Sequence, residues 1–210
     1  MTELDYFGPS DDIYCYPGTG VLKNRFGIRD RKALEEKERT ITMIRLVELD
    51  KNPVKGKFDL DHLREIHRRI FSDVYDWAGE IRTVNISRGN VFCQFNYIPE
   101  QAGILFEKLR KENYLKGLDK DKAAERLAYY LGEINAIHPF REGNGRAQRA
   151  FIRQLAREAG WIIRFDCTTD EMYEASAEAF VGKYDKLTAL VKRSMEKAER
   201  AFRNPSENSI

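Results

Sequence analysis

Residues 138–149 read His-Pro-Phe-Arg-Glu-Gly-Asn-Gly-Arg-Ala-Gln-Arg, and they separate two stretches of helical periodicity. Pro139 disfavours a helical conformation at His138, while Gly143 and Gly145 permit backbone geometry that other residues resist. We therefore predict a loop between two core helices. Apolar residues recur at helical spacing on both sides, at Ala123, Leu127, Leu131 and Ile134 before the loop and at Ala147, Phe151, Leu155 and Ala159 after it.

The same twelve residues combine groups that suit chemistry on a nucleotide. The loop ends at a predicted helix N-terminus, where free N–H groups and a partial positive charge favour a phosphate. Arg146 and Arg149 lie three residues apart in the first turns of that helix, so they share a face. His138 adds an imidazole that titrates near neutrality, and Glu142 adds a carboxylate of the kind that binds Mg²⁺.

This segment resembles the Fic motif, His-Pro-Phe-x-Asp/Glu-Gly-Asn-Gly-Arg-x-x-Arg, and it meets every fixed position. The resemblance extends from about residue 14 to about residue 190, through Gly-Lys-Phe-Asp-Leu-Asp-His at 56–62 and Asp-Trp-Ala-Gly at 76–79. The chain is similar to small bacterial Fic toxins that a separate antitoxin restrains. The resemblance implies an all-α Fic fold, a helical bundle with a small β-hairpin flap over the active site. It also implies a protein adenylyltransferase, which transfers AMP from ATP to a Tyr, Ser or Thr hydroxyl of a target protein.

Two residues of the loop carry the expected chemistry. The resemblance makes His138 the general base that deprotonates the target hydroxyl, a step that suits imidazole; the alternative is a buried histidine with no chemical role. It makes Glu142 a ligand of Mg²⁺ that bridges the α- and β-phosphates of ATP; the alternative is a solvated carboxylate or a partner for a nearby arginine. Zinc is not expected, because no regular helix spans His138 and Glu142 and neither His62 nor His67 has a matching motif.

The rest of the loop is assigned to the phosphates by the resemblance. Asn144 and the neighbouring N–H groups of Gly143 and Gly145 would hold the α-phosphate. Arg146 would bind the β-phosphate and Arg149 the γ-phosphate, because a guanidinium fork suits bidentate contact with phosphate. The alternative is a Gly-Asn-Gly turn without a ligand.

The organisation of the chain is that of one helical domain with two appendages. We predict an irregular N-terminal arm at 1–28 that packs on the domain, a Fic domain at 29–200 and a frayed tail at 201–210. Periodicity and capping residues predict helices at about 30–50, 59–73, 99–114, 120–137, 144–160, 168–181 and 183–200.

Alternating apolar residues around Arg88-Gly89-Asn90 predict a β-hairpin at about 81–98. In Fic proteins the corresponding flap lies over the active site, and the target segment adds to it as an extra strand. The resemblance implies that Arg88, Gly89, Asn90 and Val91 at its tip also touch the nucleotide. A looser match places Lys57 and Phe58 near the adenine and Ser176 at its edge.

Composition bears on which partners the chain can bind and in which cellular compartment it works. The 210 residues carry a net charge of +2, too small to indicate binding to nucleic acid or an anionic membrane. No apolar run is long enough to span a membrane, and the N-terminus lacks the features of a signal peptide. Three widely spaced cysteines predict unpaired thiols in a reducing cytoplasm; export into another cell stays open. Arg153 and Arg157 continue the row of arginines, and we predict a solvated helix face for them.

The sequence leaves alternatives open for how the activity is inhibited and for which group is transferred. Many Fic proteins are inhibited by a helix with the motif Ser/Thr-x-x-x-Glu-Gly/Asn, and no Ser or Thr among these 210 residues has Glu four positions later. We therefore expect a small inhibitory antitoxin as a separate partner. Gly145 matches relatives that transfer AMP, whereas Lys replaces it in one that phosphorylates. The alternatives are transfer of another nucleotide or of phosphocholine, or a module without enzymatic activity that binds a phosphate or a protein.

Overall fold

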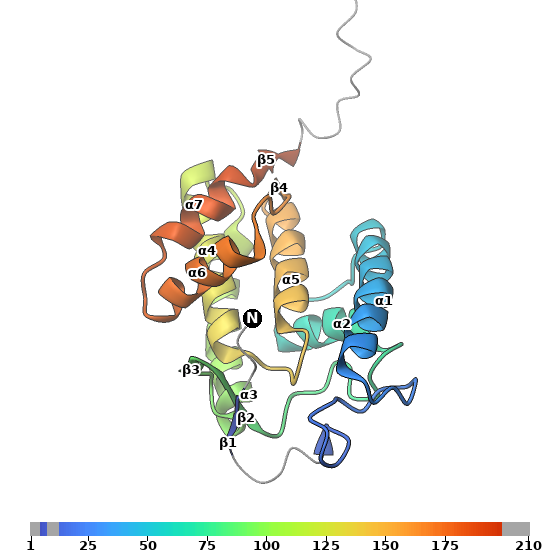
Figure 1. The fold of residues 1–210 in the computed structure, drawn as a ribbon. Helices are drawn as coiled ribbons and strands as arrows, with labels where there is room; N and C mark the ends of the chain where they lie inside the picture. Colours follow the sequence, from blue (N-terminus) through green and yellow to red (C-terminus); the bar gives the residue numbers. More distant parts are fainter. Residues whose placement is uncertain (1–4, 8–12, 199–210) are drawn as a thin grey trace, which may run out of the picture.

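The computed structural model describes residues 5–7 and 13–198, and helices make up its body (Figure 1). The predicted all-α fold with a small sheet is confirmed. The helix between residues 120 and 137 has the predicted bounds, and most of the others differ from their predictions by one to three residues. The helices are α1 (Arg31–Lys51), α2 (Leu60–Phe71), α3 (Ile98–Lys111), α4 (Lys120–Ile137), α5 (Asn144–Glu158), α6 (Thr169–Phe180) and α7 (Asp185–Arg193).

Side-chain caps explain where several helices begin. Asp30, Asp59 and Asp119 each accept a hydrogen bond from a first-turn N–H, at the starts of α1, α2 and α4. Thr168 and Glu171 form the predicted capping box at the start of α6. These local signals are independent of packing, which is why the sequence alone located the helix starts.

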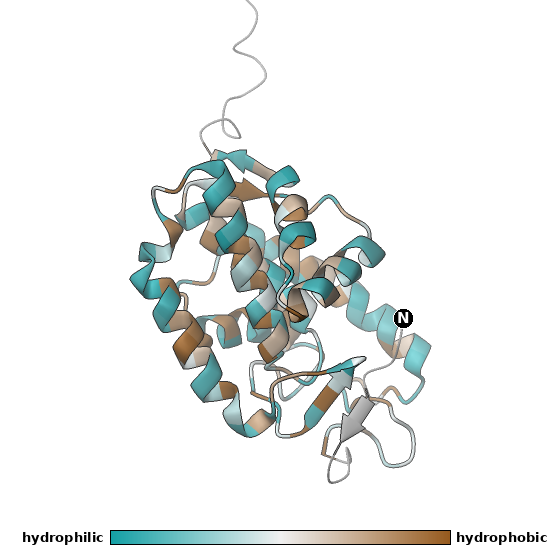
Figure 2. Cartoon of the chain, turned by 90° about the vertical axis from the view of Figure 1, so that its left-hand side faces the viewer, coloured by the Kyte–Doolittle hydropathy of each residue, from teal (hydrophilic) through white to brown (hydrophobic). Residues whose placement is uncertain are grey.

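Helices α4 and α5, which flank the loop, form the centre of the domain. Helix α4 packs against α3, α5, α6 and α7, and α5 also packs against α2. Leu127, Phe151 and Leu155 are fully buried between them. Figure 2 shows hydrophobic and hydrophilic residues interleaved along the helices, as burial of one face requires. No helix within the described part of the chain combines the length and apolar character needed to cross a membrane.

The predicted hairpin is present but shorter than expected. Strands β2 (Asn85–Arg88) and β3 (Asn90–Val91) pair antiparallel around Gly89. The second strand was predicted to reach residue 97, which is wrong: Phe95–Tyr97 form a 3₁₀-helix, η2. The backbone leaves the sheet because the N–H of Cys93 donates to the carbonyl of Ala136 in α4 (3.0 Å) instead of to a strand.

A third strand from the N-terminus completes this sheet. Strand β1 (Asp5–Phe7) pairs antiparallel with β2, so the strand order is β1-β2-β3. An irregular arm was predicted at 1–28, and the strand at 5–7 corrects that prediction. Residues 1–4 and 8–12 of the arm lie outside the described residues. Strand β2 is therefore paired on both sides. On the hairpin side of the sheet, the edge strand is β3, and its outer edge is the one that a further strand would join.

The C-terminal helix ends earlier than predicted. A helix was expected at 183–200, but α7 stops at Arg193 and the chain continues as strand β5 (Met195–Lys197). Strand β5 pairs antiparallel with β4 (Trp161–Ile163), which follows α5. This long-range pairing replaces the last helical turn. The end of the predicted helix at 199–200 and the tail at 201–210 lie outside the described residues.

Candidate active site

His138 caps the C-terminus of α4 in a left-handed conformation (φ 48°, ψ 62°). Its N–H donates to the carbonyl of Ile134 (3.0 Å), and its ring Nδ1 lies 3.0 Å from the carbonyl oxygen of Asn135. A carbonyl only accepts hydrogen bonds, so Nδ1 carries the proton and Nε2 presents a lone pair. The loop thus holds a half-buried imidazole in the tautomer that a general base needs.

The surroundings of His138 keep its ring neutral. The ring of Phe92, which follows β3, stacks on it with 3.8 Å between centroids and an interplanar angle of 18°. Burial, reinforced by the positive charges of Arg82 and Arg88, lowers the pKa of His138 to about 3. The imidazole is therefore unprotonated at neutral pH. A negatively charged ligand bound beside it would raise this pKa toward the range of an effective base.

Asn144 closes the loop on itself. Its side-chain oxygen accepts from the N–H of Phe140 (2.9 Å), and its side-chain nitrogen donates to the carbonyl of Phe140 (2.7 Å). Gly143 has φ of +81°, and a Cβ there would overlap the ring of Phe71. The amide of Asn144 therefore shapes the loop, and what this residue offers an anion is its backbone N–H. That N–H and the N–H of Gly145 belong to the first turn of α5 and have no intrahelical acceptor.

Glu142 leaves part of its carboxylate open beside this helix N-terminus. Its Oε1 accepts from the N–H of Gly143 (2.8 Å) and lies 3.8 Å from the guanidinium of Arg146. Its Oε2 has no partner among the residues that the structure describes. Within those residues no three His, Cys, Asp or Glu side chains converge as a metal site. One open carboxylate oxygen fits an Mg²⁺ that takes its other ligands from phosphates and water.

Arg146 is already paired with helix α1. Its guanidinium contacts the carboxylate of Glu38, donates to the hydroxyl of Thr42 (3.0 Å) and lies over the ring of Phe71 at 4.6 Å. The other carboxylate oxygen of Glu38 accepts from the hydroxyl of Tyr75, whose pKa is raised by burial and by that neighbouring negative charge. Arg146 therefore has a fixed position and a compensated charge.

Arg149, one turn further along α5, has no such compensation. It is half-buried, and no carboxylate of the described residues pairs with it. Burial and the positive charges of Arg153 and Arg146 lower its pKa. A half-buried guanidinium without a counter-charge is costly, and an anion bound there would remove part of that cost.

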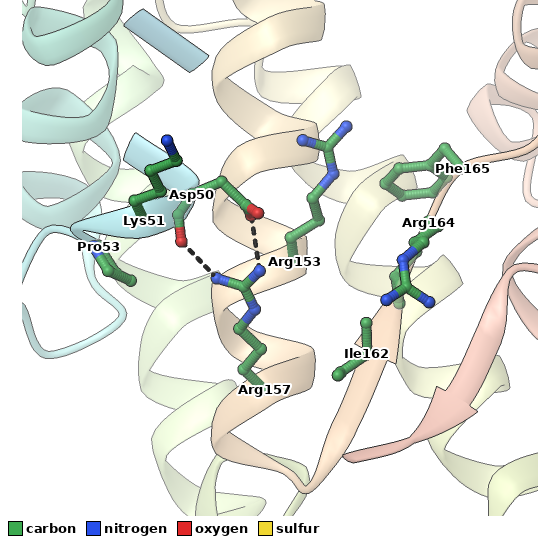
Figure 3. A pocket seen from close by; sticks show the side chains of 9 residues that line it. Asp50, Lys51, Pro53, Arg153, Arg157, Ile162, Arg164 and Phe165 are labelled. Atoms are coloured by element: carbon green, nitrogen blue, oxygen red, sulfur yellow. Dashed lines mark hydrogen bonds and ion pairs between the residues drawn. The ribbon is translucent and has the colours of Figure 1, made fainter. Parts of the chain in front are cut away.

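The row of arginines leads into a separate pocket of about 640 Å³ between the end of α1, α5 and β4 (Figure 3). Arg157 is exposed and pairs there with Asp50 (2.6 Å), which agrees with the predicted solvated face. Arg153 departs from that prediction. It is half-buried, burial lowers its pKa, and its guanidinium lies 5.8 Å from the ring centre of Phe165. Arg153 and Arg157 are four residues apart and so share one face of α5, and both line this pocket.

The flap approaches His138 through Phe92 and Arg88 rather than through the rest of its tip. Gly89, Asn90 and Val91 are exposed, and Val91 retains 58% of its surface. Arg88 is half-buried, its Nε is buried without a hydrogen-bond partner, and its charge acts on His138. The structure thus brings Arg88 to the loop and leaves the other three tip residues open to solvent.

The residues predicted to surround the adenine are more dispersed. The ring of Phe58 packs among His62, Tyr114 and Phe151, beside the middle of α5, and the adjacent Lys57 is exposed. None of these contacts reaches the loop at 138–146, so the assignment of Lys57 and Phe58 stays a prediction. Ser176 is half-exposed on α6, one turn before Phe180, whose ring meets that of Phe92.

Sequence reasoning missed His67 and Glu38, which hold the loop from behind. His67 is fully buried; its Nε2 donates to the carbonyl of Glu142 (2.9 Å) and its Nδ1 accepts from the N–H of Gly79 (2.8 Å). Burial lowers the pKa of His67 to about 3. A polar residue at a core-facing position is the signal for both: Glu38 lies four residues after the buried Leu34 of α1.

Comparison with known proteins agrees with this geometry. Residues 57–156 match the model of the Fic/DOC family. The chain is 45% identical over 188 residues to the protein adenylyltransferase VbhT of Bartonella schoenbuchensis, which covers 89% of this chain and 39% of VbhT. It is 42% identical to the probable protein adenylyltransferase Fic of Escherichia coli, over 89% of this chain and 92% of that protein. The chain therefore spans well under half the length of VbhT but nearly all of the Escherichia coli protein.

Solved structures show the same fold. The BepC protein of Bartonella tribocorum with bound AMPPNP superposes with a TM-score of 0.83 at 29% identity, covering 89% of this chain and 97% of that one. The N-terminal Fic domain of a Bartonella quintana effector with bound ADP gives a TM-score of 0.84 at 28% identity, covering 90% and 97%. Fold and loop together define a Fic-type domain of the protein adenylyltransferase class. The chain belongs to the Fic/DOC family.

Proposed function

We propose that this chain transfers AMP from ATP to a Tyr, Ser or Thr hydroxyl of a target protein, as the toxin of a toxin–antitoxin pair. The observation that carries the proposal is the pairing of a neutral His138, whose Nε2 lone pair is available, with an anion-binding helix N-terminus six residues later. The relatives named adenylyltransferases and the nucleotide-bound relatives support the same chemistry.

The residues of the loop have separate roles in the proposed reaction. His138 accepts the proton of the target hydroxyl at Nε2 while the hydroxyl oxygen attacks the α-phosphorus of ATP. A new P–O bond forms, the bond between the α-phosphorus and its bridging oxygen breaks, and pyrophosphate leaves. The N–H groups of Asn144 and Gly145 stabilise negative charge on the α-phosphate. Because the protein supplies positioning and charge rather than a covalent intermediate, fixed geometry accounts for most of the rate.

The β- and γ-phosphates are assigned to two arginines that differ in whether a carboxylate already pairs with them. Arg146, fixed by Glu38, is placed for the β-phosphate, and the uncompensated Arg149 for the γ-phosphate. Mg²⁺, which the open oxygen of Glu142 fits, would neutralise charge on the α- and β-phosphates. Each of these roles follows the motif position by position, and each is a separate target for substitution.

The target strand is expected at the outer edge of β3. Strand β2 has β1 on one side and β3 on the other, so both of its edges are paired. The N–H of Phe92 donates to the carbonyl of Ile86 (3.2 Å), and successive residues of an antiparallel strand alternate in direction. Val91 therefore directs its N–H away from β2, toward that free edge. A strand added there would lie beside Phe92, which stacks on His138.

The uncompensated Arg149 supports restraint by a separate antitoxin. A glutamate presented to this guanidinium would neutralise its charge and occupy the site of the γ-phosphate. The inhibitory motif is absent from these 210 residues, and we propose that a separate antitoxin supplies the glutamate. An antitoxin whose Glu is changed to Gly is then expected to stay bound but to permit transfer.

Label transfer tests the proposed activity directly. The chain is incubated in a bacterial lysate with ATP labelled either at the α-phosphate or at the γ-phosphate, with and without Mg²⁺. AMP transfer marks protein only from the α-labelled ATP, in the presence of Mg²⁺, and the His138→Ala variant gives no signal. Label from the γ-position would instead identify a kinase, and no label from either would overturn the proposal.

Growth tests the toxin–antitoxin part separately. The chain is expressed alone, together with the proposed antitoxin, and as His138→Ala, with soluble levels confirmed in each culture. We expect arrested growth only when the active chain is expressed alone. Healthy growth in that culture would contradict the proposal that the chain is a toxin, but it would not contradict the proposed AMP transfer.

A further inference from the structure

Arg82 is a fully buried arginine that joins the flap to the end of helix α4. It lies just before β2 and retains 1% of its surface. Its Nε donates to the carbonyl of His138 (2.8 Å), and its backbone N–H donates to the carbonyl of Pro139 (2.9 Å). The guanidinium also donates to the carbonyls of Val84 (2.6 Å) and Cys93 at the two sides of the flap.

This arginine is compensated only by carbonyl groups. No carboxylate among residues 13–198 pairs with it, and burial lowers the pKa of Arg82 to about 10. The carbonyl of Ile137 is a further acceptor, at 3.3 Å. Ile137 is the last residue of α4 and His138 is its C-terminal cap, and at this end the helix dipole is negative and favours a cation. A buried charge without an ion pair is unusual, and here the guanidinium donates four hydrogen bonds, two to the flap and two to the end of α4.

The two elements that Arg82 joins are the ones that the reaction must keep in register. His138 accepts the proton from the target hydroxyl, and the flap holds the strand that carries this hydroxyl. Two further contacts link these elements within the described residues: Phe92 stacks on His138 (3.8 Å between ring centroids), and the N–H of Cys93 donates to the carbonyl of Ala136 (3.0 Å). Arg82 touches neither the nucleotide loop at 142–149 nor the open edge of β3.

We propose that Arg82 is a positioning residue that fixes the flap at a set distance from the base, a role that rests on the proposed AMP transfer. A guanidinium fork reaches carbonyls on both sides because its donors diverge in one plane, whereas a lysine ammonium is a single point on a flexible stem. Loss of the bridge displaces the hydroxyl from His138 without touching the phosphates. A displacement of about 1 Å in such a reaction costs on the order of 100-fold in rate.

The experiment compares Arg82→Gln and Arg82→Lys with a matched control, Arg126→Gln. Arg126 lies in α4 and is half-buried, and it pairs with Glu112 (2.8 and 2.7 Å) about three helical turns before His138. For each variant we measure the melting temperature, the affinity for a non-hydrolysable ATP analogue, and kcat for the acceptor found in the labelling experiment. Amide hydrogen exchange at 85–91 and at 137–138 is measured in the same samples.

We expect Arg82→Gln to keep nucleotide affinity within about twofold and to lose about 100-fold in kcat. Arg82→Lys, which keeps the charge but cannot span both elements, is expected to lose about tenfold. Arg126→Gln should keep kcat, whatever its melting temperature. Exchange should accelerate at the flap and at 137–138 together in the Arg82 variants and remain slow in the control.

Three outcomes would overturn the proposal: normal kcat in Arg82→Gln, full activity in Arg82→Lys, or equal losses of kcat in Arg82→Gln and Arg126→Gln. If Arg82→Gln does not fold, Arg82→Lys decides by the same criteria. If the wild-type chain transfers no AMP, the proposed function fails. Hydrogen exchange then tests independently whether Arg82 holds the flap to the end of α4. Unchanged exchange at 85–91 in the Arg82 variants would exclude that role.

Discussion

The two ends of the loop at 138–149 differ in how their polar groups are used. At the first end, the Nδ1 of His138 is bound by a carbonyl, its ring is stacked and its backbone is held by Arg82. At the second end, Arg149 has no carboxylate partner in the described part of the chain, and the first N–H groups of α5 have no intrahelical acceptor. We call the first end the occupied end, because it is held in place and leaves the lone pair on Nε2 of His138 open, and the second end the open end.

This difference teaches how a small domain can be both preorganised and receptive. The general base needs a fixed tautomer and position before the substrate arrives, since proton transfer depends on geometry. The phosphate site needs donors whose charge is not already satisfied, because an occupied donor offers little to a ligand. Arg146 stands between the two cases, since Glu38 fixes it but leaves part of its guanidinium for a phosphate.

The largest expected effect removes the occupied end. His138→Ala should reduce AMP transfer by about 1,000-fold or more, because it removes the imidazole assigned to accept the hydroxyl proton. Affinity for a non-hydrolysable ATP analogue should stay within about twofold, because His138 is assigned to the hydroxyl and not to the phosphates. Single-turnover kinetics with titrated nucleotide measure both. If His138→Ala still modified the target at the normal rate, the assignment of proton transfer to the first end of the loop would be wrong.

A second pair of variants sharpens the contrast between Arg146 and Arg149. Arg149→Ala should weaken ATP binding by about 10- to 100-fold, the worth of a charge-assisted contact. It should not lower the melting temperature, because it removes a half-buried charge that has no partner. Arg146→Ala should instead lower stability by about 3 kcal/mol, because it leaves Glu38 buried and unpaired. Denaturant unfolding and calorimetry separate the two effects, and equal losses of stability in both variants would contradict the contrast.

The sequence predicted the helices and the loop because both depend on local signals. The caps at Thr168 and Asp119 and the break at Pro139 act within a few residues. Contacts between distant segments were missed: the pairing of β1 with β2, the pairing of β5 with β4, and the contact of Glu38 with Arg146 across 108 residues. No periodicity encodes such contacts. The contact of the Asn144 side chain with the backbone of Phe140 is local, but it depends on the exact shape of the loop, which no pattern specifies; the assignment of Asn144 to the α-phosphate stays a prediction.

The flap edge carries a smaller effect that tests how the target reaches the occupied end. Val91→Pro removes an N–H that points to the free edge of β3 and leaves the ladder with β2 intact. We expect about a tenfold loss in target modification, the worth of about one hydrogen bond, and a much smaller loss in self-modification. Val91→Ala, which keeps the N–H, should retain target modification. Initial rates of label transfer measure both, and unchanged target modification in Val91→Pro would exclude strand addition at this edge.

The last prediction is a dependence of stability on pH that comes from His67. Burial lowers the pKa of His67 to about 3 in the folded protein, against an ordinary value of 6.5. The unfolded chain therefore binds a proton that the folded protein excludes between these values. The stability contributed by neutral His67 is present above about pH 6.5 and falls as the pH drops toward 3, by at most about 1.4 kcal/mol per unit. A glutamine could accept from Gly79 and donate to Glu142 as the imidazole does, without titrating. Urea unfolding from pH 8 to pH 4.5 should therefore show a steeper loss of stability in the wild type than in His67→Gln. Because the carboxylates are common to both proteins, parallel curves would mean that His67 takes up its proton in the folded state, and the back of the loop would then be less closed than its contacts indicate.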